Sequence, residues 1–524
     1  MERIIEHVAA LWRNYTGTEA AEITKLPQSG SDRLYFRIRA GSAVGNGNAV
    51  NNGSSPGNGI TATQPAIVTD PGPAYNGISS CKHSCIATYN NNLRENQTFL
   101  SFTESLRSAG CPVANVVALN DAGDTYLQED FGDTSLLNLL EQQGYSAEVY
   151  ALFQESLSKL AHLQVRGGAQ INYDMCLTAH EFGKQAILSD LLYFKYYFLD
   201  TLKFPYDKQA LLNDFEALST YLTHTENKHF MFRDFQSRNI MVTDDGQVHF
   251  IDYQGGMRGA LQYDVASLLW QARAELPEDW KNSLLEYYIG EVSQHLPHPL
   301  DPALFTAQYN GYVLIRLLQV LGAYGFRGFF QRKAQFLSSI PLALKNLAAF
   351  TDSRRMGIAV PEFDKCLQYC TSEEVMAKFE PLRADESTPL VVRIHSFSYK
   401  KGIPPDPTEN GGGFVFDCRG ILNPGRIAEY KTQTGRDKAV RDYLEQRTVM
   451  PDYLNSVFDL VDITVTDYIK RGFESLQVNF GCTGGQHRSV YAAEALARHL
   501  KNKFGVRIEL RHLMQEEKNW INTG

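Results

Sequence analysis

The sequence is poor in cysteine, which excludes one class of protein. Eight cysteines among 524 residues are too few for the disulfide framework of a small secreted domain. The closest groupings are a C-x-H-x-C cluster and a pair four positions apart (Cys81, His83, Cys85; Cys366, Cys370). Adjacent side chains of this kind cannot easily face one metal ion, and no second ligand pair has zinc-finger spacing. We therefore expect reduced thiols.

The sequence also lacks a signal-like start and a long apolar run. The first twelve residues, MERIIEHVAALW, contain no basic segment followed by a long apolar core, so they do not predict a secretory signal. The most apolar stretch, Tyr312–Phe326, is interrupted by Arg316 and is shorter than the roughly 20 residues that span a bilayer. These absences predict a soluble, cytoplasmic protein with no membrane partner.

What is present is typical of a multidomain globular protein. Hydrophobic residues make up 43% and charged residues 21%, close to the globular average, and the length predicts about two to four domains. The net charge of −9 is unevenly spread: residues 391–524 carry 19 Lys and Arg against 16 Asp and Glu, whereas residues 1–390 carry 31 against 43. This asymmetry indicates two units with different partners, or only noise in the surface composition.

Composition and periodicity divide the chain. Residues 41–77 contain eight Gly, six Asn and four Pro with Asp70 as the only charge, so they cannot bury enough apolar surface to order themselves. Strand-like alternation precedes and follows this flexible insertion, and helical periodicity dominates later. The expected parts are a β-rich segment 1–130, a helical segment 131–350, a polar linker 351–388 and a strand-rich unit 389–520.

A polar loop and a hairpin carry the first chemical signal. Asp234 and Asn239 lie five positions apart. Asp252 follows the second of two short apolar strands joined by the turn Asp244-Asp-Gly246. Because the hairpin folds back, the three polar side chains should converge, with Asp234 orienting an attacking hydroxyl and the other two holding Mg²⁺ on a nucleotide. Taken singly, such residues would only cap turn amides, but the combination predicts phosphoryl transfer.

This pattern resembles the kinase-like aminoglycoside and sugar phosphotransferases over residues 20–345. The resemblance implies ATP and Mg²⁺ as cofactors. It also implies an α+β, protein-kinase-like bilobal domain with a β-rich N-lobe and a helical C-lobe, here followed by a separate α/β domain. The segment Leu26–Phe36 resembles the loop that covers the phosphates, and Tyr126–Gly132 resembles the hinge that pairs with adenine. The implied nucleotide-binding residues are Gly30, Ser31, Glu95, Glu129 and Phe131.

Within this family the sequence is most similar to bacterial cell-wall amino-sugar kinases. Those enzymes phosphorylate N-acetylmuramate or N-acetylglucosamine at the anomeric hydroxyl, so the resemblance implies a small sugar substrate. It also implies that Asp264, in the segment after the second metal aspartate, braces the catalytic loop. From the general preference of aspartate for helix starts we expect Asp264 to be an N-cap.

Two departures from the family pattern leave an alternative open. Phe232 stands where the family usually has His, and no strand lysine is visible in Ile86–Asn90, although Glu95 resembles the helix glutamate that would pair with it. Lys82, Arg94 or Arg37 could substitute for the lysine. Without a substitute, the domain would be a non-catalytic pseudokinase that binds nucleotide.

A glycine-rich loop near the carboxyl end predicts an anion site. Gly481-Cys-Thr-Gly-Gly-Gln-His-Arg-Ser-Val490 follows an apolar strand and precedes a helix, so its backbone and the helix N-terminus can bind an anion. Arg488 can grip a phosphate in bidentate fashion. The spacing from Cys482 to Arg488 also fits the C-x₅-R-S pattern of cysteine-dependent phosphatases, and a solvated tight turn is the plain structural alternative.

Val391–Glu517 resembles the carboxyl-terminal domain of the RapZ family of bacterial RNase adapters. The resemblance rests on ordered motifs: Ser396–Pro404, Phe416–Arg419, Leu422–Pro424, Thr434–Asp437 and Gly481–Val490. It implies binding of a phosphorylated amino sugar, glucosamine-6-phosphate in the family, and contact with small regulatory RNA or an RNase. The implied anion-binding residues are Thr483, Gly484, Gly485, His487 and Arg488.

Two departures concern this second resemblance. Gly425 stands where the family's Asn-Pro-His motif has histidine, and no P-loop G-x-x-x-x-G-K-[ST] occurs in the sequence. The leading hypothesis is an ATP-dependent amino-sugar phosphotransferase fused to a phosphosugar-sensing domain. The alternative is a non-catalytic adapter that binds nucleotide, an amino-sugar phosphate and RNA, although the weak positive charge of residues 391–524 is mild for RNA binding.

Overall fold

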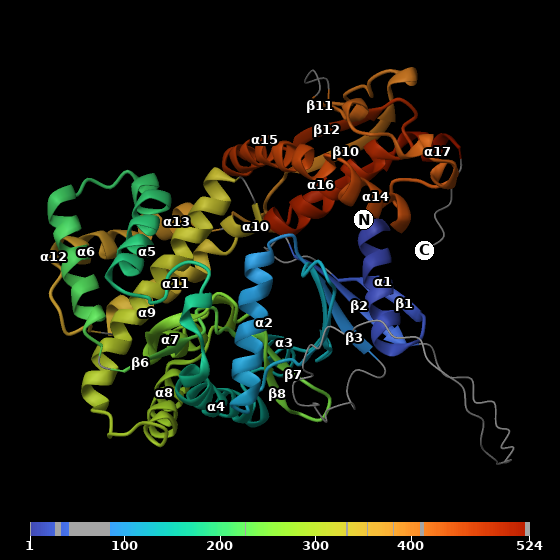
Figure 1. Cartoon of the computed structure of the whole chain (residues 1–524). Coiled ribbons are helices and arrows are strands. Elements are labelled where there is room, and N and C mark those ends of the chain that lie inside the picture. Colours follow the sequence, from blue (N-terminus) through green and yellow to red (C-terminus); the bar gives the residue numbers. More distant parts are fainter. Residues whose placement is uncertain are drawn as a thin grey trace, which may run out of the picture. The chain divides into compact units, whose positions relative to one another are not determined.

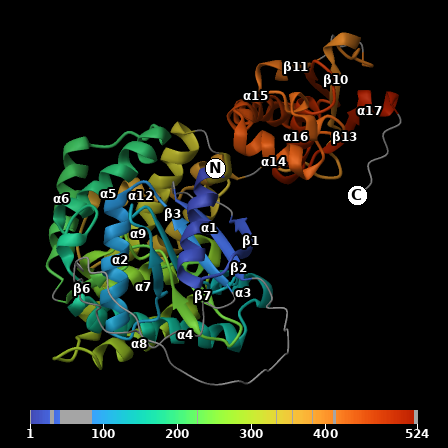
Figure 2. The same ribbon diagram turned by 45° about the vertical axis from the view of Figure 1, so that its right-hand side comes forward.

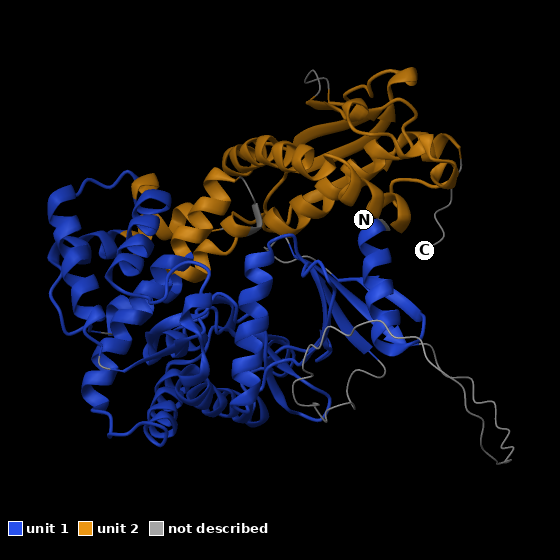
Figure 3. Cartoon of the chain, in the orientation of Figure 1, with its two compact units in different colours: residues 1–199, 203–320, 345–369 blue, residues 200–202, 321–344, 370–524 orange. Residues whose placement is uncertain are grey.

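The computed structural model describes residues 2–26, 33–40, 84–225, 227–331, 334–353, 355–380, 382–408 and 413–518 (Figure 1). The predicted insertion 41–77, together with Gly30, Ser31 and Lys82, lies outside these described residues. The chain forms two compact units (Figure 3). Unit 1 comprises residues 1–199, 203–320 and 345–369, and unit 2 comprises residues 200–202, 321–344 and 370–524.

Unit 1 begins with an antiparallel sheet. Its strands follow the order β1-β2-β3-β5-β4: β1 (Ala20–Lys25), β2 (Leu34–Ala40), β3 (Ser84–Tyr89), β5 (Thr125–Glu129) and β4 (Val116–Leu119). Helix α1 (Glu2–Thr16) adds Val8, Leu11 and Trp12 to a core shared with Phe36 and Ile38 of β2. Helix α2 (Leu93–Ser108) follows β3 and begins at an Asn92 cap. The predicted β-rich N-lobe is confirmed.

The rest of unit 1 is mainly helical, as periodicity predicted. Its helices include α3 (Leu136–Gln143), α4 (Ala147–His162), α5 (Lys184–Tyr197), α6 (Lys208–Thr223), α7 (Leu261–Leu269), α8 (Glu278–Ser293), α9 (Pro302–Gly325) and α11 (Ile340–Ser353). Two antiparallel pairs lie among them: β6 (Lys228–Met231) with β9 (Met257–Ala260), and β7 (Ile240–Val242) with β8 (Val248–Phe250). The predicted hairpin is the β7–β8 pair, and its register brings Ile240 opposite Phe250.

The segment expected to be a polar linker contains two helices, α12 (Pro361–Cys370) and α13 (Glu373–Phe379). Phe363, Cys366 and Cys370 of α12 are fully buried, and the Phe363 ring meets the Phe215 ring edge-on at 4.9 Å between centroids. Apolar side chains at three- and four-residue spacing form one face of a helix. This part of the segment is therefore folded, and the expectation of a plain linker was wrong there.

Unit 2 contains a parallel sheet. The strands follow the order β11-β12-β10-β13: β11 (Phe414–Asp417), β12 (Ser475–Cys482), β10 (Val391–Ser398) and β13 (Arg507–His512). Parallel neighbours need crossover connections, which here include α14 (Lys438–Arg447), α15 (Met450–Arg471) and α16 (Arg488–Phe504). In Figures 1 and 2 α16 runs beside these strands, and it packs on β10 and β12. The predicted separate α/β domain is confirmed.

One helix is long and apolar enough to cross a membrane among the residues described. It is the continuous segment Pro302–Phe330, and 56% of its most apolar window is buried inside the protein. Arg316 within it is 5% exposed and is hydrogen-bonded to polar side chains of unit 1. These features are also those of a core helix.

Candidate functional site

The loop between β6 and β7 brings the three predicted phosphotransfer residues together. A 3₁₀ turn, Ser237–Asn239, ends the loop, and Nδ2 of Asn239 donates to the backbone oxygen of Asp234 at 2.9 Å. The backbone N–H of Ile251 donates to the backbone oxygen of Asn239 at 3.1 Å. Asp252, the next residue, therefore lies close to Asn239. The hairpin therefore brings these three residues together through backbone contacts, while the roles of their side chains stay predictions.

The side chain of Asp264 fixes the backbone of this loop by hydrogen bonds. Its carboxylate is fully buried and accepts hydrogen bonds from the backbone N–H groups of Phe232 at 2.8 Å and Arg233 at 2.9 Å. Nε2 of Gln164 adds a third bond at 2.9 Å. Burial raises the pKa of Asp264 to about 7, against the opposing effect of these donors. The N-cap expectation was wrong, because helix α7 begins at Leu261 and its cap is Ala260.

Two arginines, Arg316 and Arg233, form ion pairs with Asp234 and Asp190. Nη2 of Arg316 donates to Oδ1 of Asp234 at 3.1 Å, and the Arg316 side chain is 6% exposed whereas that of Asp234 is 48% exposed. Arg233, with a positive φ of 76°, contacts both oxygens of Asp190 at 3.4 Å. Burial raises the pKa of Asp190 although Arg233 opposes this. The four charges balance, so this group presents no surplus negative charge.

Asp252 and Asn239 fit the ligand set of a divalent cation. Asp252 has a positive φ of 72°, a conformation that non-glycine residues hold mainly where surrounding structure demands it. Its Oδ1 accepts from Nε2 of Gln254 at 2.7 Å, and the Asp252 side chain is 44% exposed. The Asn239 amide is oriented by its N–H bond to Asp234, which directs its side-chain oxygen away from that bond. Carboxylate and amide oxygens are suitable Mg²⁺ ligands.

Glu95 of α2 has a cationic partner that the sequence analysis did not identify. Arg33, just before β2, forms an ion pair with Glu95, and its Nη1 lies 3.8 Å from Oδ1 of Asp252. Arg33 is only 3% exposed. It stands in the quoted Leu26–Phe36 motif, so its place next to the predicted phosphate loop was the signal that could have found it.

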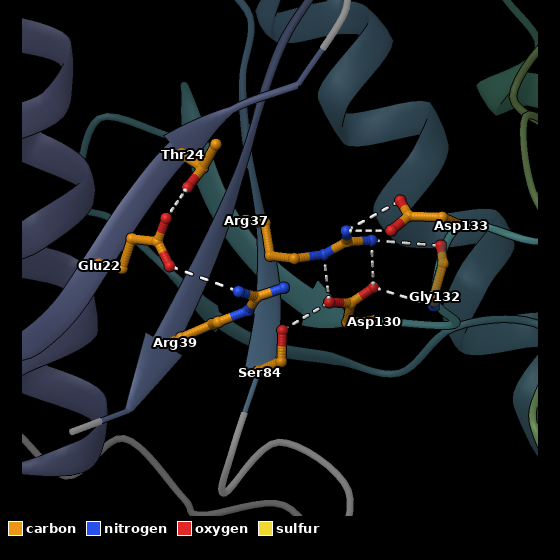
Figure 4. Close-up of polar contacts among 8 residues, drawn as sticks. All are labelled: Glu22, Thr24, Arg37, Arg39, Ser84, Asp130, Gly132 and Asp133. Atoms are coloured by element: carbon orange, nitrogen blue, oxygen red, sulfur yellow. Dashed lines mark hydrogen bonds and ion pairs between the residues drawn. The ribbon is translucent and has the colours of Figure 1, made fainter. Parts of the chain in front are cut away.

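The arginines named as substitutes for the strand lysine have other partners. Arg37 of β2 points to the hinge, where its guanidinium bonds both Asp130 and Asp133 at 2.7 to 3.0 Å (Figure 4). Arg94 donates to the backbone oxygen of Asp174 at 2.8 Å. Lys82 lies outside the described residues. Neither described candidate is therefore directed to the catalytic loop.

The two predicted hinge residues lie at the end of β5. The Glu129 carboxylate accepts from the backbone N–H of Asn115 at 2.9 Å, which fixes the strand rather than presenting the carboxylate to a ligand. The Phe131 ring stacks on the His249 ring of β8 with centroids 4.0 Å apart. Burial lowers the pKa of His249, so its ring is favoured in the neutral form. These contacts hold the hinge against the hairpin, and adenine pairing by its backbone stays a prediction.

In unit 2 the glycine-rich loop connects β12 to α16 around a pocket of about 260 Å³. The pocket is lined by Asn423, Gly425, Lys431, Cys482, Thr483, Gly484, Gln486, His487 and Arg488. Four of the five predicted anion-binding residues are in this set. The fifth, Gly485, has φ +66°, and a Cβ there would come within 2.4 Å of Met514. Gly485 therefore shapes the loop, while Gly484 has open space around it.

Backbone carbonyls orient the Arg488 and His487 side chains of the pocket. Nη1 of Arg488 donates to the oxygens of Arg419 at 3.0 Å and Ile421 at 2.7 Å, and Nε2 of His487 lies 2.8 Å from the oxygen of Tyr430. Arg488 is 5% exposed, and its Nε is buried without a hydrogen-bond partner among the described residues. A buried donor without a partner is costly, so Arg488 is suited to an anion in the pocket.

Cys482, which the phosphatase alternative requires, borders the same pocket. Its sulfur lies 3.2 Å from the Ser489 hydroxyl and accepts from the Gly485 N–H at 3.2 Å. Burial alone would raise the pKa of Cys482, but bonds to Ser489, the Arg488 charge and the Gly485 amide lower it. No carboxylate lines the pocket within the described part of the chain. A leaving alkoxide would therefore have no acidic donor there, and the geometry favours anion binding over hydrolysis.

Comparisons with known proteins agree with this division. The model described as the phosphotransferase enzyme family matches residues 89–299, and that of the RapZ C-terminal domain matches residues 390–515. The chain joins a phosphotransferase domain to a RapZ C-terminal domain. Curated relatives called nucleotide-binding proteins match the second part. That of Endomicrobium trichonymphae is 40% identical over 129 residues, covering 24% of this chain and 43% of the relative. The chain thus spans about two fifths of the length of that relative.

Solved structures resemble the phosphotransferase part in fold. A putative aminoglycoside phosphotransferase from Ralstonia eutropha has 13% identity and a TM-score of 0.36, covering 72% of this chain and 97% of that one. A choline kinase from Cryptosporidium parvum has 11% identity and a TM-score of 0.42, covering 69% and 99%. The predicted protein-kinase-like class is confirmed by the phosphotransferase family match together with the antiparallel sheet and the helices that follow it.

Proposed function

We propose that this protein is a cytoplasmic, ATP- and Mg²⁺-dependent phosphotransferase acting on a hydroxyl of a cell-wall amino sugar. Its carboxyl-terminal domain would sense a phosphorylated amino sugar. The observation that carries the first part is the meeting of Asp234, Asn239 and Asp252 at one end of a hairpin whose loop is braced by the buried Asp264. Positioning and electrostatics supply most of the catalysis in phosphoryl transfer.

Each residue has a role that follows from its contacts. Arg316 holds Oδ1 of Asp234, which leaves Oδ2 to accept the proton of the acceptor hydroxyl as its oxygen attacks the γ-phosphorus and ADP leaves. The side-chain oxygen of Asn239 and Oδ2 of Asp252 would hold Mg²⁺, which neutralises phosphate charge when bound. The brace from Asp264 keeps the loop backbone, and hence Asp234, in one position.

The balance of charges around Asp234, where the acceptor hydroxyl would lie, supports a neutral or acidic sugar as the substrate. Arg233 and Arg316 balance Asp190 and Asp234, so a cationic acceptor would meet no uncompensated carboxylate among these residues. An amino sugar with an acylated nitrogen carries no positive charge. This favours an N-acetylated sugar over an amino alcohol or an aminoglycoside.

The sensing part of the proposal rests on the pocket in unit 2. A phosphate there would meet the Arg488 guanidinium, whose Nε has no hydrogen-bond partner in the described chain, and the open backbone at Gly484. Gly425 removes the family's histidine, but its Cα lies against the His487 ring, since a Cβ would be 3.1 Å from that ring. The backbone of Gly425 therefore lies against the His487 ring on the side where the family's histidine side chain would begin.

The test is ATP turnover by the full chain across a panel containing N-acetylmuramate, N-acetylglucosamine and glucosamine. Asp234→Ala should reduce transfer by about 10²- to 10⁴-fold and leave nucleotide affinity mostly unchanged. Asp244→Ala, at the exposed hairpin turn, is the matched control and should be fully active. Full activity of Asp234→Ala would refute the proposal. No turnover by the wild type, with phosphosugar or RNA binding retained, would support the non-catalytic adapter instead.

A further inference from the structure

The ion pair between Arg33 and Glu95 lies beside Asp252, the predicted Mg²⁺ ligand. Asn90 holds the other oxygen of Glu95 through Nδ2 at 3.0 Å, and the Tyr35 hydroxyl lies 3.4 Å from Nη1 of Arg33. Nη1 of Arg33 is also 3.8 Å from Asp252. The guanidinium thus connects helix α2 and strand β2 with the aspartate that follows the hairpin.

This position is close to where nucleotide phosphates would bind. If Asp252 ligates the Mg²⁺ that bridges the phosphates, a cation 3.8 Å from Asp252 lies within reach of the same phosphates. Nε of Arg33 is buried and has no hydrogen-bond partner within the described residues. Arginine carries five N–H donors in a rigid fork, so it can bond Glu95 and still offer donors to a second anion.

We propose that Arg33 binds the phosphates of the nucleotide and replaces the lysine that is missing from strand β3. The proposal rests on the phosphotransferase function proposed above. The cation would come from the start of β2 instead of β3, and the pairing with the helix glutamate would be kept. The domain would then bind nucleotide phosphates despite the missing lysine, which removes the main argument for a pseudokinase.

A purely structural ion pair is the alternative, and phosphate dependence separates the two. We suggest titrating the full chain with ADP plus Mg²⁺, and separately with adenosine, for wild type, Arg33→Met and Arg33→Lys. Arg39→Met is the matched control, because Arg39 lies on β2, the strand that Arg33 precedes, is 60% exposed and faces Glu22 (Figure 4). Melting curves report whether each variant is folded.

For Arg33→Met we expect ADP affinity to fall about 10- to 100-fold, as for a lost charged hydrogen-bond donor, with adenosine affinity unchanged. Arg33→Lys should recover part of the loss, and Arg39→Met should match wild type. Unchanged ADP affinity, or an equal loss of adenosine affinity, would overturn the proposal. If ADP binding depends on Arg33 but no sugar is turned over by the wild type, the inference stands and the kinase proposal fails.

Discussion

The two candidate sites both gather charged groups at the end of a strand, but they balance those charges differently. In unit 1 two buried arginines near the hairpin face carboxylates: Arg33 faces Glu95 and Asp252, and Arg316 faces Asp234. In unit 2 Arg488 donates to two neutral carbonyl oxygens, and its pocket contains no carboxylate among the described residues.

This difference suggests two ways of binding phosphate. Paired acids and arginines suit a site where phosphates arrive together with a metal ion, because the acids hold the metal and the arginines hold the phosphates. An arginine whose hydrogen bonds go to neutral carbonyl oxygens has no carboxylate hydrogen-bonded to it and can attract an anion directly. Unit 1 should therefore depend on Mg²⁺ for tight nucleotide binding, and unit 2 should bind a phosphosugar without metal.

The largest effect should follow loss of the loop brace in unit 1. Asp264→Ala leaves the buried N–H groups of Phe232 and Arg233 without their acceptor, which costs about 2–6 kcal/mol for two such groups. The melting transition of unit 1 should fall and turnover should be lost, while phosphosugar binding by unit 2 persists. Asp264→Asn keeps one acceptor oxygen, so its melting temperature should lie between those of Asp264→Ala and the wild type. Wild-type stability of Asp264→Ala would contradict the brace.

The next effect compares two neighbouring glycines in unit 2. Gly485→Ala combines an unfavourable positive φ with a clash against Met514, for a cost of about 2–4 kcal/mol, measured as a lower melting temperature. Gly484→Ala has open space and should melt like wild type, but its methyl group should weaken phosphosugar binding if the ligand approaches this backbone. Equal stability of both variants would show that the loop geometry is wrong.

A smaller effect tests Arg488 directly. Arg488→Lys keeps the charge but cannot reproduce the bonds to the Arg419 and Ile421 oxygens, so glucosamine-6-phosphate affinity should fall about tenfold or more, as for a charged hydrogen bond. Calorimetric titration without Mg²⁺ measures it. Lys438→Met, with a side chain 81% exposed and paired to Asp442, is the charge control. Unchanged affinity in Arg488→Lys would remove Arg488 from the site.

The sequence was sufficient for those parts of the site that are local in the chain. The turn at Asp244-Asp-Gly246 and five-residue spacing were enough to predict that Asp234, Asn239 and Asp252 converge. The β-rich lobe and the separate α/β domain also followed from periodicity and resemblance. The predicted domain boundary near residue 389 stays a prediction, because the compact units divide the chain by contacts at other positions.

Features that depend on tertiary contacts could not be predicted in this way. Arg33 and Glu95 are 62 residues apart, so no spacing rule connects them. From the sequence, Arg37 was a candidate substitute for the strand lysine, but in the structure it bonds Asp130 and Asp133. Asp264 fits an N-cap by propensity, but its carboxylate is used by a loop 31 residues earlier. The carbonyls that orient Arg488 are backbone atoms, which carry no sequence signal.

The smallest effect concerns the thiol that borders the unit 2 pocket. The pKa of Cys482 is lowered by Ser489, Arg488 and Gly485 against the effect of burial, whereas burial raises the pKa of Cys418 to about 12. The thiolate attacks the methylene carbon of iodoacetamide and displaces iodide, so alkylation of Cys482 should rise at a lower pH than for an ordinary cysteine near about 8.5, and Cys418 should stay unmodified. Peptide mass spectrometry across pH measures both sites.

A bound phosphate should oppose that thiolate, because two negative charges would share one pocket. Glucosamine-6-phosphate at ten times its Kd should therefore slow alkylation of Cys482 about tenfold, and its affinity should fall as pH rises through the pKa of Cys482. The guanidinium of Arg488 stays charged throughout, and burial lowers the pKa of His487, which favours its neutral ring. Cys482→Ser should bind the phosphosugar with no such pH dependence. If the phosphosugar affinity of Cys482→Ser still falls as pH rises, the thiol does not lie beside the ligand. Another group must then balance the charge of Arg488.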